Sequence, residues 1–389
     1  MRTVDVEIWR HPSVRFSNSK ADRIFADASK RLQRKDGMRD VPVDIQFVRK
    51  GNVNVLPNNV PGVMRSRSDY NEVFNIARTS LKLVRGIQSC GTHTGTFAGC
   101  APVGVNRLDM TIKGTSRSLD IILPHEFGHN CGLPDRRDNS QFIMFGAVRS
   151  GMKFVDQREA SKYLNGPLET LEGELPEVTS EVPDSARRID DFVFTEYIHG
   201  IPFEEASQYG EEEARYLEEL LKDPRNEEFF TQIVTTLCYI GDPASRDAIV
   251  NFIKNTAFNT DDAFEAKLAA ILHLGDFIQQ TDDGNAFDFL KTLATEDSAE
   301  KDLAIAQSNA VESVEEEGVV APDTNEIMED LTASAALGLG LVATPAANDA
   351  LETLGRSSSS SETLREVSKS AKETAEKIST EGWEGYRKN

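Results

Sequence analysis

The sequence predicts an α+β fold for residues 1–166 and an all-α fold for most of the remaining chain. Strand-like and helix-like patterns alternate in the first region, and helical periodicity dominates from about residue 200. Between them the chain is acidic and contains several prolines. The length of 389 residues also exceeds that of one small domain. We therefore expect an α+β domain at 1–166, a linker at 167–199, a helical domain at 200–356 and a low-complexity polar tail at 357–389.

Composition restricts the classes of partner. The net charge of −21 argues against a nucleic-acid surface and against an anionic membrane as partner. No apolar run reaches about eighteen residues, so we expect no membrane span. Residues 1–9 alternate polar and apolar and lack the apolar core of a signal peptide. The chain is therefore expected to be cytoplasmic, or exported by a route that this stretch does not display.

The first region contains strands and helices in alternation. Strands are predicted at 4–9, 41–48, 81–89 and 96–103, and a helix at 17–36. In the second strand, Val43, Ile45 and Phe47 share one face. A helix that follows a strand predicts a mostly parallel sheet with crossover helices.

A cluster of residue types at metal-ligand spacing follows these elements. His125 and His129 are four residues apart, so on a helix their imidazoles project from one face, one turn apart. Glu126 can stand beside a metal without binding it and accept a proton from water. Gly132 is suited to the left-handed turn that ends the helix, and this turn would bring Asp135 to the metal as third ligand. Three ligands and a water are typical of a catalytic site.

The helix that carries the two histidines is predicted to begin near Ser116 or Ser118, either of which could cap it. Pro124 predicts a kink or a later start of this helix. Beyond it, a further helix is expected at 156–164 with Asp156 as its cap.

The pattern His125-Glu126-x-x-His129-x-x-Gly132-x-x-Asp135 resembles the extended zinc signature of the metzincin metallopeptidases. It is similar to the variant with aspartate as third ligand that occurs in snapalysin-type bacterial neutral proteases. The resemblance covers about the first 165 residues. It implies a mixed sheet with a zinc helix, Zn2+ as cofactor, and Glu126 as general base.

The resemblance also implies a methionine turn and a strand that binds substrate. Met144, within Phe142-Ile143-Met144-Phe145-Gly146, matches the turn, although Gly146 stands where many metzincins have a tyrosine. In that family an antiparallel edge strand before the zinc helix pairs with extended substrate. The corresponding residues here are Phe97, Ala98, Gly99, Cys100 and Ala101. A simple core strand is the alternative.

The remaining cysteines and histidines carry weaker signals. Cys90 and Cys100 flank a short Gly/Thr-rich segment, and the sequence is compatible with a disulfide or with two reduced thiols. No role is assigned to the histidines that lack a ligand spacing: His11, His93, His199 and His273.

The helical region contains a repeated turn pattern. Gly241-Asp242-Pro243 separates two predicted helices, Gly275-Asp276 recurs 34 residues later, and 341–345 has a third such turn. Helix–turn–helix units of this kind resemble HEAT-type repeats and imply a short curved solenoid, with an irregular helical bundle as the alternative. A polar helix is predicted at 361–378, loosely held because it has almost no apolar face.

Taken together, these features predict a zinc-dependent endopeptidase that hydrolyses protein or peptide substrates with a metal-activated water. One alternative is a helical-repeat scaffold that binds a protein partner and carries a regulatory or inactive peptidase-like domain. Another makes residues 190–389 an inhibitory or substrate-docking module of the peptidase.

Overall fold

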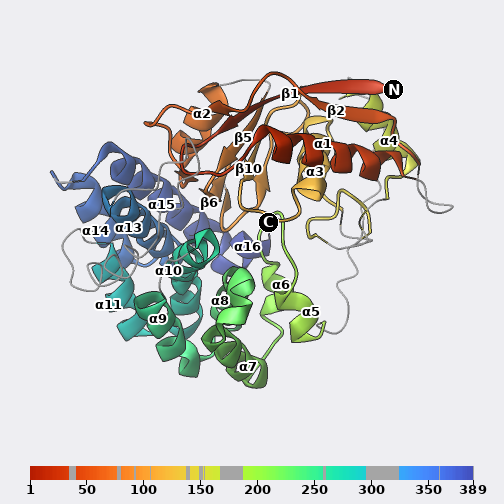
Figure 1. The fold of residues 1–389 in the computed structure, drawn as a ribbon. Coiled ribbons are helices and arrows are strands. Elements are labelled where there is room, and N and C mark those ends of the chain that lie inside the picture. Colours follow the sequence, from red (N-terminus) through yellow and green to blue (C-terminus); the bar gives the residue numbers. More distant parts are fainter. Residues whose placement is uncertain are drawn as a thin grey trace.

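The computed structural model describes residues 1–34, 41–76, 80–91, 93–105, 107–136, 141–148, 152, 154–166, 187–256, 260–294, 324–358 and 360–388. A mixed α/β region and a helical region pack side by side (Figure 1). Most of the predicted linker, 167–186, lies outside the described residues. Among the residues that are described, no helix is both long enough and apolar enough to cross a membrane.

The α/β region is built on a mixed sheet with strand order β2-β1-β5-β10-β9. Neighbouring strands in this order are parallel, except that β9 runs antiparallel to β10, and the short β3 also pairs with β1. The expected antiparallel edge strand is therefore present. The strands of the sheet are β1 (Arg2–Arg10), β2 (Ile45–Arg49), β3 (Asn54–Val55), β5 (Ser80–Val84), β9 (Gly99–Cys100) and β10 (Met110–Lys113).

Two helices and two short strand pairs complete this region around the sheet. Ser17 caps α1 (Asn18–Gln33), which buries Phe25 and Leu32 in the same core as the alternate side chains of β1 and β2. The remaining elements are α2 (Arg67–Ile76), β4 (Val63–Met64) paired with β6 (Gly86–Ile87), and β7 (Ser89–Cys90) paired with β8 (His93–Thr94).

The predicted metal-binding helix is α3 (Leu119–Asn130), which is buried along almost its whole length. It begins five residues before Pro124, so a later start is wrong. The predicted closing helix is α4 (Gln157–Asn165), and Asp156 forms a capping box with Glu159 at its start. Tyr163 of α4 donates a hydrogen bond of 2.9 Å to the carbonyl oxygen of Pro124, which fixes α4 beneath α3.

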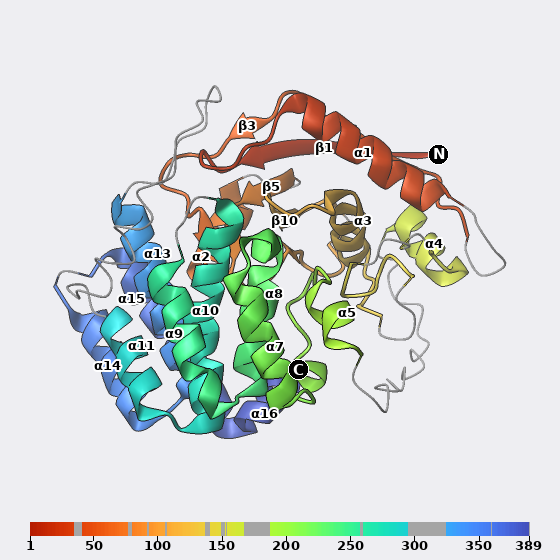
Figure 2. The same cartoon turned by 60° about the horizontal axis from the view of Figure 1, so that its bottom comes forward.

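Helices of the second region form two layers (Figure 2). In one layer α10 packs between α8 and α13, and α13 packs between α10 and α15. This layer consists of α8 (Phe230–Ile240), α10 (Asp261–Thr281), α13 (Thr324–Val342) and α15 (Glu362–Glu381). The other layer consists of α7 (Glu211–Lys222), α9 (Arg246–Asn255), α11 (Gly284–Leu293) and α14 (Pro345–Arg356). Short elements also present are α5 (Ile189–Val193), α6 (Phe203–Ala206), η1 (Pro224–Phe229), η2 (Pro243–Ser245) and α16 (Trp383–Lys388).

The first and third predicted turns of the repeat pattern are confirmed. Gly241 ends α8 in the left-handed conformation, with φ of 67°, and Asp242 caps the following turn of helix. Ala343 and Thr344 separate α13 from α14, and the Thr344 side chain caps α14.

The predicted turn at Gly275-Asp276 is wrong, because α10 continues through both residues to Thr281. A Cβ atom at position 275 would lie 2.8 Å from the carbonyl carbon of Gly338 in α13. The glycine therefore allows two helices to approach closely and does not end one of them.

The C-terminal residues are packed more tightly than the sequence indicated. The α15 helix buries Val367, Ala371 and Ile378 against the helical core. Small side chains such as alanine and valine therefore form an apolar face, although almost none was expected from the sequence. Arg387 of α16 donates to both oxygens of the buried Asp276, at 2.7 Å to Oδ1. The expectation of a loosely held helix is therefore wrong.

Charged and polar side chains join the two regions across their contact. Arg85 after β5 forms an ion pair with Glu326 at 2.9 Å, and both Arg85 and Arg65 contact the buried Asp330 of α13. Lys113 of β10 binds Glu265 of α10 at 2.6 Å. Buried charge pairs are costly to separate because each ion would be left without its partner. The helical region is thus fixed against the side of the sheet that carries the predicted substrate strand.

Candidate metal centre

The two motif histidines meet as the helical spacing predicts. Their Nε2 atoms are 3.2 Å apart, and both side chains are buried. The Nδ1 atom of His125 lies 2.7 Å from the carbonyl oxygen of Ile143, and that of His129 lies 2.8 Å from the carbonyl oxygen of Leu133. A carbonyl oxygen only accepts, so each Nδ1 carries the proton and each Nε2 presents a lone pair to the centre.

Asp135 reaches the same point by the predicted turn. Gly132 has φ of +83° directly after the helix, and the chain reverses there. The Oδ1 atom of Asp135 lies 3.2 Å from Nε2 of His125 and 3.6 Å from Nε2 of His129. The three predicted ligands therefore come together at one place.

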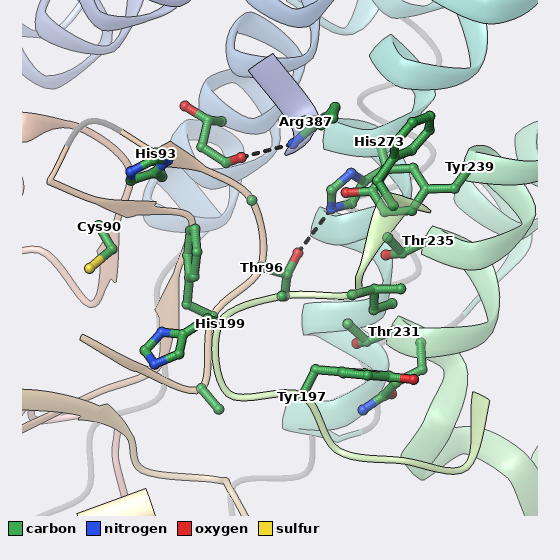
Figure 3. A pocket seen from close by; sticks show the side chains of 18 of the residues that line it. Cys90, His93, Thr96, Tyr197, His199, Thr231, Thr235, Tyr239, His273 and Arg387 are labelled. Atoms are coloured by element: carbon green, nitrogen blue, oxygen red, sulfur yellow. Dashed lines mark hydrogen bonds between the residues drawn. The ribbon is translucent and has the colours of Figure 1, made fainter. Parts of the chain in front are cut away.

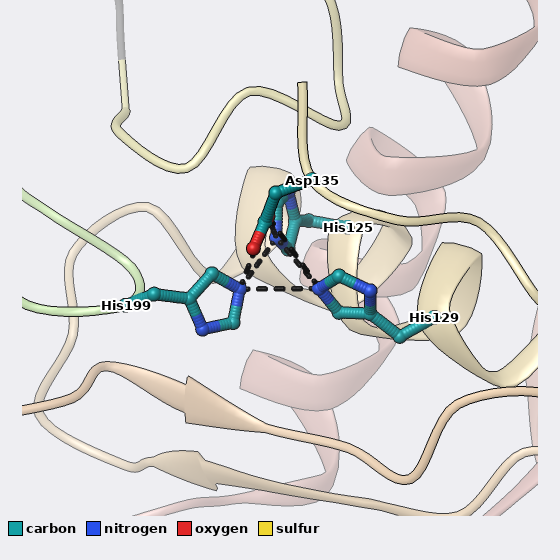
Figure 4. Close-up of side chains that lie close together, drawn as sticks. All are labelled: His125, His129, Asp135 and His199. Atoms are coloured by element: carbon teal, nitrogen blue, oxygen red, sulfur yellow. Dashed lines mark hydrogen bonds and ion pairs between the residues drawn. The ribbon is translucent and has the colours of Figure 1, made fainter. Parts of the chain in front are cut away.

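A fourth donor, His199, completes the group (Figure 4). Its Nε2 atom lies 2.8 Å from that of His125, 3.1 Å from that of His129 and 3.5 Å from Oδ1 of Asp135. No role was predicted for His199, because it stands alone in the sequence, on the segment between α5 and α6. Its sole sequence signal is that histidine is scarce here, with six in 389 residues.

The four donor atoms form a nearly regular tetrahedron. All six distances between them fall between 2.8 and 3.6 Å. Four points at nearly equal mutual distances have one central position equidistant from all of them, which a metal ion could occupy. The expectation of a fourth corner left for water is wrong in this structure, because His199 lies there.

The electrostatics favour protonation states that bind metal at three of the four donors. Burial lowers the pKa of His129 to about 4 and that of His199 to about 3, so both are neutral near pH 7. Burial acts to raise the pKa of Asp135, but the nearby histidines outweigh it and lower this pKa, so the group is a carboxylate. For His125, the contacts with Asp135 outweigh burial and raise the pKa.

Glu126 is a buried carboxylate beside this tetrahedron. Its side chain has no exposure, and neither oxygen has a hydrogen-bond partner among the residues that the structure describes. Burial raises its pKa to about 8. Oε1 lies 3.9 Å from Nε2 of His199. Burying a carboxyl group without hydrogen-bond partners costs free energy. Its position next to a corner of the tetrahedron therefore fits a site in which bound polar groups supply the missing hydrogen bonds.

Met144 is fully buried and is not one of the four donors. Its sulfur lies 3.2 Å from the hydroxyl oxygen of Tyr163. Gly128 of α3 makes room for this contact, since a Cβ atom there would lie 2.7 Å from the Tyr163 oxygen. The geometry is compatible with the predicted packing role of Met144, which stays a prediction.

The predicted substrate strand lies at the edge of the sheet and is already paired on its outer side. Gly99 and Cys100 form β9, and the amide of Ala98 donates a 2.8 Å hydrogen bond to the carbonyl oxygen of Ile198. A disulfide joins Cys100 to Cys90 across a Cα–Cα distance of 5.9 Å, which decides the alternative that the sequence left open. The side chains of Phe97 and Cys100 are buried in a small core of their own. The substrate role of 97–101 stays a prediction.

A cavity of about 280 Å³ adjoins the metal centre between the two regions (Figure 3). His199, His93 and Thr96 line it from one side, and Tyr239 and His273 from the other. Asp135 also lines it and is 42% exposed, so the tetrahedron is accessible through this cavity.

Comparison with known proteins adds no assignment. No protein-family model matches this sequence, and the search of curated proteins finds no match. The geometry and chemistry of the donor set are therefore the basis for any functional conclusion.

Proposed function

We propose that this protein is a zinc-dependent endopeptidase. Three imidazole nitrogens and one carboxylate oxygen are a donor set typical of zinc. A tetrahedral zinc ion with bonds of about 2.0–2.1 Å requires ligand atoms about 3.3 Å apart. The observed spacings of 2.8–3.6 Å agree with this size. His125, His129 and Asp135 would hold the ion in the working enzyme.

The observation that carries the hydrolytic role is the state of Glu126. A purely structural zinc site gains nothing from a buried carboxyl group without partners, and burying one costs free energy. A peptidase requires such a group beside the metal as general base. Burial raises the pKa of Glu126, so a carboxyl group that has accepted a proton is stabilised at this place.

The metal, the Glu126 carboxyl group and the edge strand would each have a separate role in hydrolysis. When bound, zinc polarises the scissile carbonyl group and lowers the pKa of water. Glu126 accepts the proton of the attacking water and donates it to the leaving amine. The edge strand around Ala98 aligns the peptide substrate through backbone hydrogen bonds. The amide of Ala98 can form such a bond, because it points outward from the sheet and donates to the carbonyl oxygen of Ile198.

A second candidate function is a structural zinc site that joins the two regions. It is favoured by His199, which supplies a fourth protein ligand from the chain leading into the helical region. Closed four-ligand sites are typical of structural zinc. In this case the chain would be a helical scaffold with an inactive peptidase-like region.

Zinc content and peptide hydrolysis separate these candidates. The full chain, the His199→Ala variant and the His199→Ala/Glu126→Gln double variant are compared by metal analysis and by digestion of a peptide library, with and without chelator. We expect zinc in all three, chelator-sensitive cleavage by His199→Ala, and a loss of roughly 10²–10⁴-fold in the double variant. Zinc in all three without any cleavage would support the structural alternative.

A further inference from the structure

We propose that residues Glu196-Tyr197-Ile198-His199-Gly200, here called the strap, are an intramolecular peptide ligand of the substrate groove and keep the peptidase latent. This inference rests on the proposed function. It defines the substrate as an extended peptide that lies between the edge at residues 96–98 and the segment at 146–148. It also assigns His199 to the place at the metal that substrate and water need.

One side of the strap pairs with the predicted substrate strand. The carbonyl oxygen of Ile198 accepts a 2.8 Å hydrogen bond from the amide of Ala98. Gly200 lies against Thr96, because a Cβ atom on Gly200 would be 3.4 Å from the Thr96 carbonyl oxygen. Residue 198 is thus opposite 98 and residue 200 opposite 96, so the strap runs antiparallel to the edge. A substrate that adds to this edge would use the same amide.

The other side of the strap pairs with the chain after the methionine turn. The amide of Ile198 donates to the carbonyl oxygen of Gly146 at 3.0 Å. The amide of Val148 donates to the carbonyl oxygen of Glu196 at 2.7 Å, and Tyr197 forms an antiparallel bridge with Ala147. Backbone hydrogen bonds therefore hold an extended peptide from both sides, as a bound substrate would be held.

This register directs the imidazole of His199 to the metal centre. The ring lies next to Gly146, where an added Cβ atom would be 3.9 Å from Cδ2 of His199. A large side chain at 146 would compete for the space of the ring. The Nε2 atom fills a corner of the tetrahedron that lies 3.9 Å from Oε1 of Glu126. While it stays there, Glu126 has no water to activate at that corner.

The strap is held by the helical region, and its histidine is partly exposed to the adjoining cavity. The Tyr197 hydroxyl donates to the carbonyl oxygen of Phe192 at 3.2 Å and accepts from Arg187 at 3.0 Å. Ile198 is fully buried in the core of the α/β region. His199 itself is 26% exposed toward the adjoining cavity, so a small metal-binding molecule can approach the corner from there.

Metal accessibility tests the inference without a catalytic assay. The full chain and the His199→Ala variant are loaded with Co2+, and acetohydroxamate is titrated while the visible absorption spectrum is recorded. His93→Ala is the control, because His93 lines the same cavity and lies outside the tetrahedron. We expect one metal ion per chain in all three, and acetohydroxamate binding at least roughly 10-fold tighter in His199→Ala than in the other two.

Hydrogen exchange gives a second readout of the strap. The amide of Ala98 should exchange faster in His199→Ala than in the full chain and in His93→Ala, because its partner Ile198 is less firmly held. Equal acetohydroxamate affinity in the full chain and in His199→Ala, or loss of the metal from His199→Ala, would overturn the inference. Should His199→Ala fail to fold, His199→Gln replaces it with the same expected results and the same contradicting ones.

The two proposals fail in different ways. If His199→Ala binds acetohydroxamate at its metal but cleaves no peptide, the strap is the occupant of the metal corner and the peptidase function is wrong. If the full chain already cleaves peptides at the rate of His199→Ala, the peptidase function stands and the latent role of the strap is wrong.

Discussion

Gly99 lies directly against the carboxyl group of Glu126: a Cβ atom at position 99 would be 2.7 Å from Cδ of Glu126. Real Cβ atoms do not approach other atoms this closely, so any side chain at 99 would displace the carboxyl group. The edge strand that is proposed to bind substrate and the proposed general base therefore constrain each other through this one contact. Gly99 has an ordinary φ, so close approach and not backbone conformation is the reason for glycine here.

Gly99→Ala should therefore impair catalysis without removing metal. In the His199→Ala background we expect kcat to fall by roughly 10²-fold or more. The reason is that Glu126 would be moved from the position in which it can accept a proton from water. Zinc content, measured by metal analysis, should not change. Gly284→Ala is the control, since a Cβ atom there meets nothing within 4 Å. An unaltered kcat in Gly99→Ala would show that the Glu126 carboxyl group is not required where it lies.

Replacing Asp135 should weaken metal binding. Asp135→Asn exchanges the sole carboxylate of the tetrahedron for a neutral amide, a poorer zinc ligand. We expect zinc affinity to fall by at least roughly 100-fold, as measured by competition with a chromophoric chelator. His93→Ala again serves as control and should bind zinc as the full chain does. Equal affinity in Asp135→Asn would exclude Asp135 from the ligand set.

The disulfide should stabilise the edge strand measurably. Cys90 and Cys100 close a loop with a sequence separation of 10, for which chain entropy predicts about 2–3 kcal/mol. Cys90→Ser/Cys100→Ser should lower the free energy of unfolding in urea by about that amount. Reductant should destabilise the full chain similarly and leave the double variant unaffected, because the other two cysteines are free thiols. Full stability of the double variant would contradict a stabilising bridge.

Gly275 should tolerate no side chain. In Gly275→Ala the new methyl group would press against the Gly338 backbone, and separating α10 from α13 should cost about 1–3 kcal/mol of unfolding free energy. Gly284→Ala controls for the general effect of replacing glycine by alanine in a helix. If Gly275→Ala were as stable as this control, the helices would not depend on the close approach.

Arg387 should stabilise the fold through Asp276. Removing the guanidinium leaves a buried carboxylate with His273 and Trp383 as its neutral donors, so Arg387→Ala should lose about 3–5 kcal/mol near pH 7. The control Arg215→Ala removes an arginine whose partner Glu211 is exposed, and should cost less than about 1 kcal/mol.

The effect of Arg387→Ala should also depend on pH. Burial acts to raise the pKa of Asp276, but Arg387 and His273 outweigh it and lower this pKa below its ordinary value. The ion pair of Asp276 with Arg387 therefore contributes its full stabilisation of the folded state above the unfolded pKa of about 3.9. This stabilisation is lost as pH falls through the folded pKa of Asp276. Urea unfolding at a series of pH values should show the difference between the full chain and Arg387→Ala shrinking in acid. A difference that is constant with pH would exclude the charge of Asp276 as its cause.

Local sequence determined the parts of the centre that lie on one helix and its turn. Two histidines at a spacing of four must project from one face, because the helical repeat fixes their directions. The cap at Asp156 and the turn at Gly241 were predictable for the same reason, since each depends on backbone groups within a few residues.

Only the tertiary structure decided what fills the fourth corner. His199 reaches the metal centre because two separate segments pair with the strap, and no periodic signal in the sequence records such pairing. The role of Gly275 and the burial of α15 were hidden likewise, because each depends on which helix packs opposite. Short-range hydrogen bonds depend on neighbouring residues, whereas long-range contacts depend on how the whole chain packs. The sequence thus determined a helix with two histidines on one face, and the fold determined that His199 joins them.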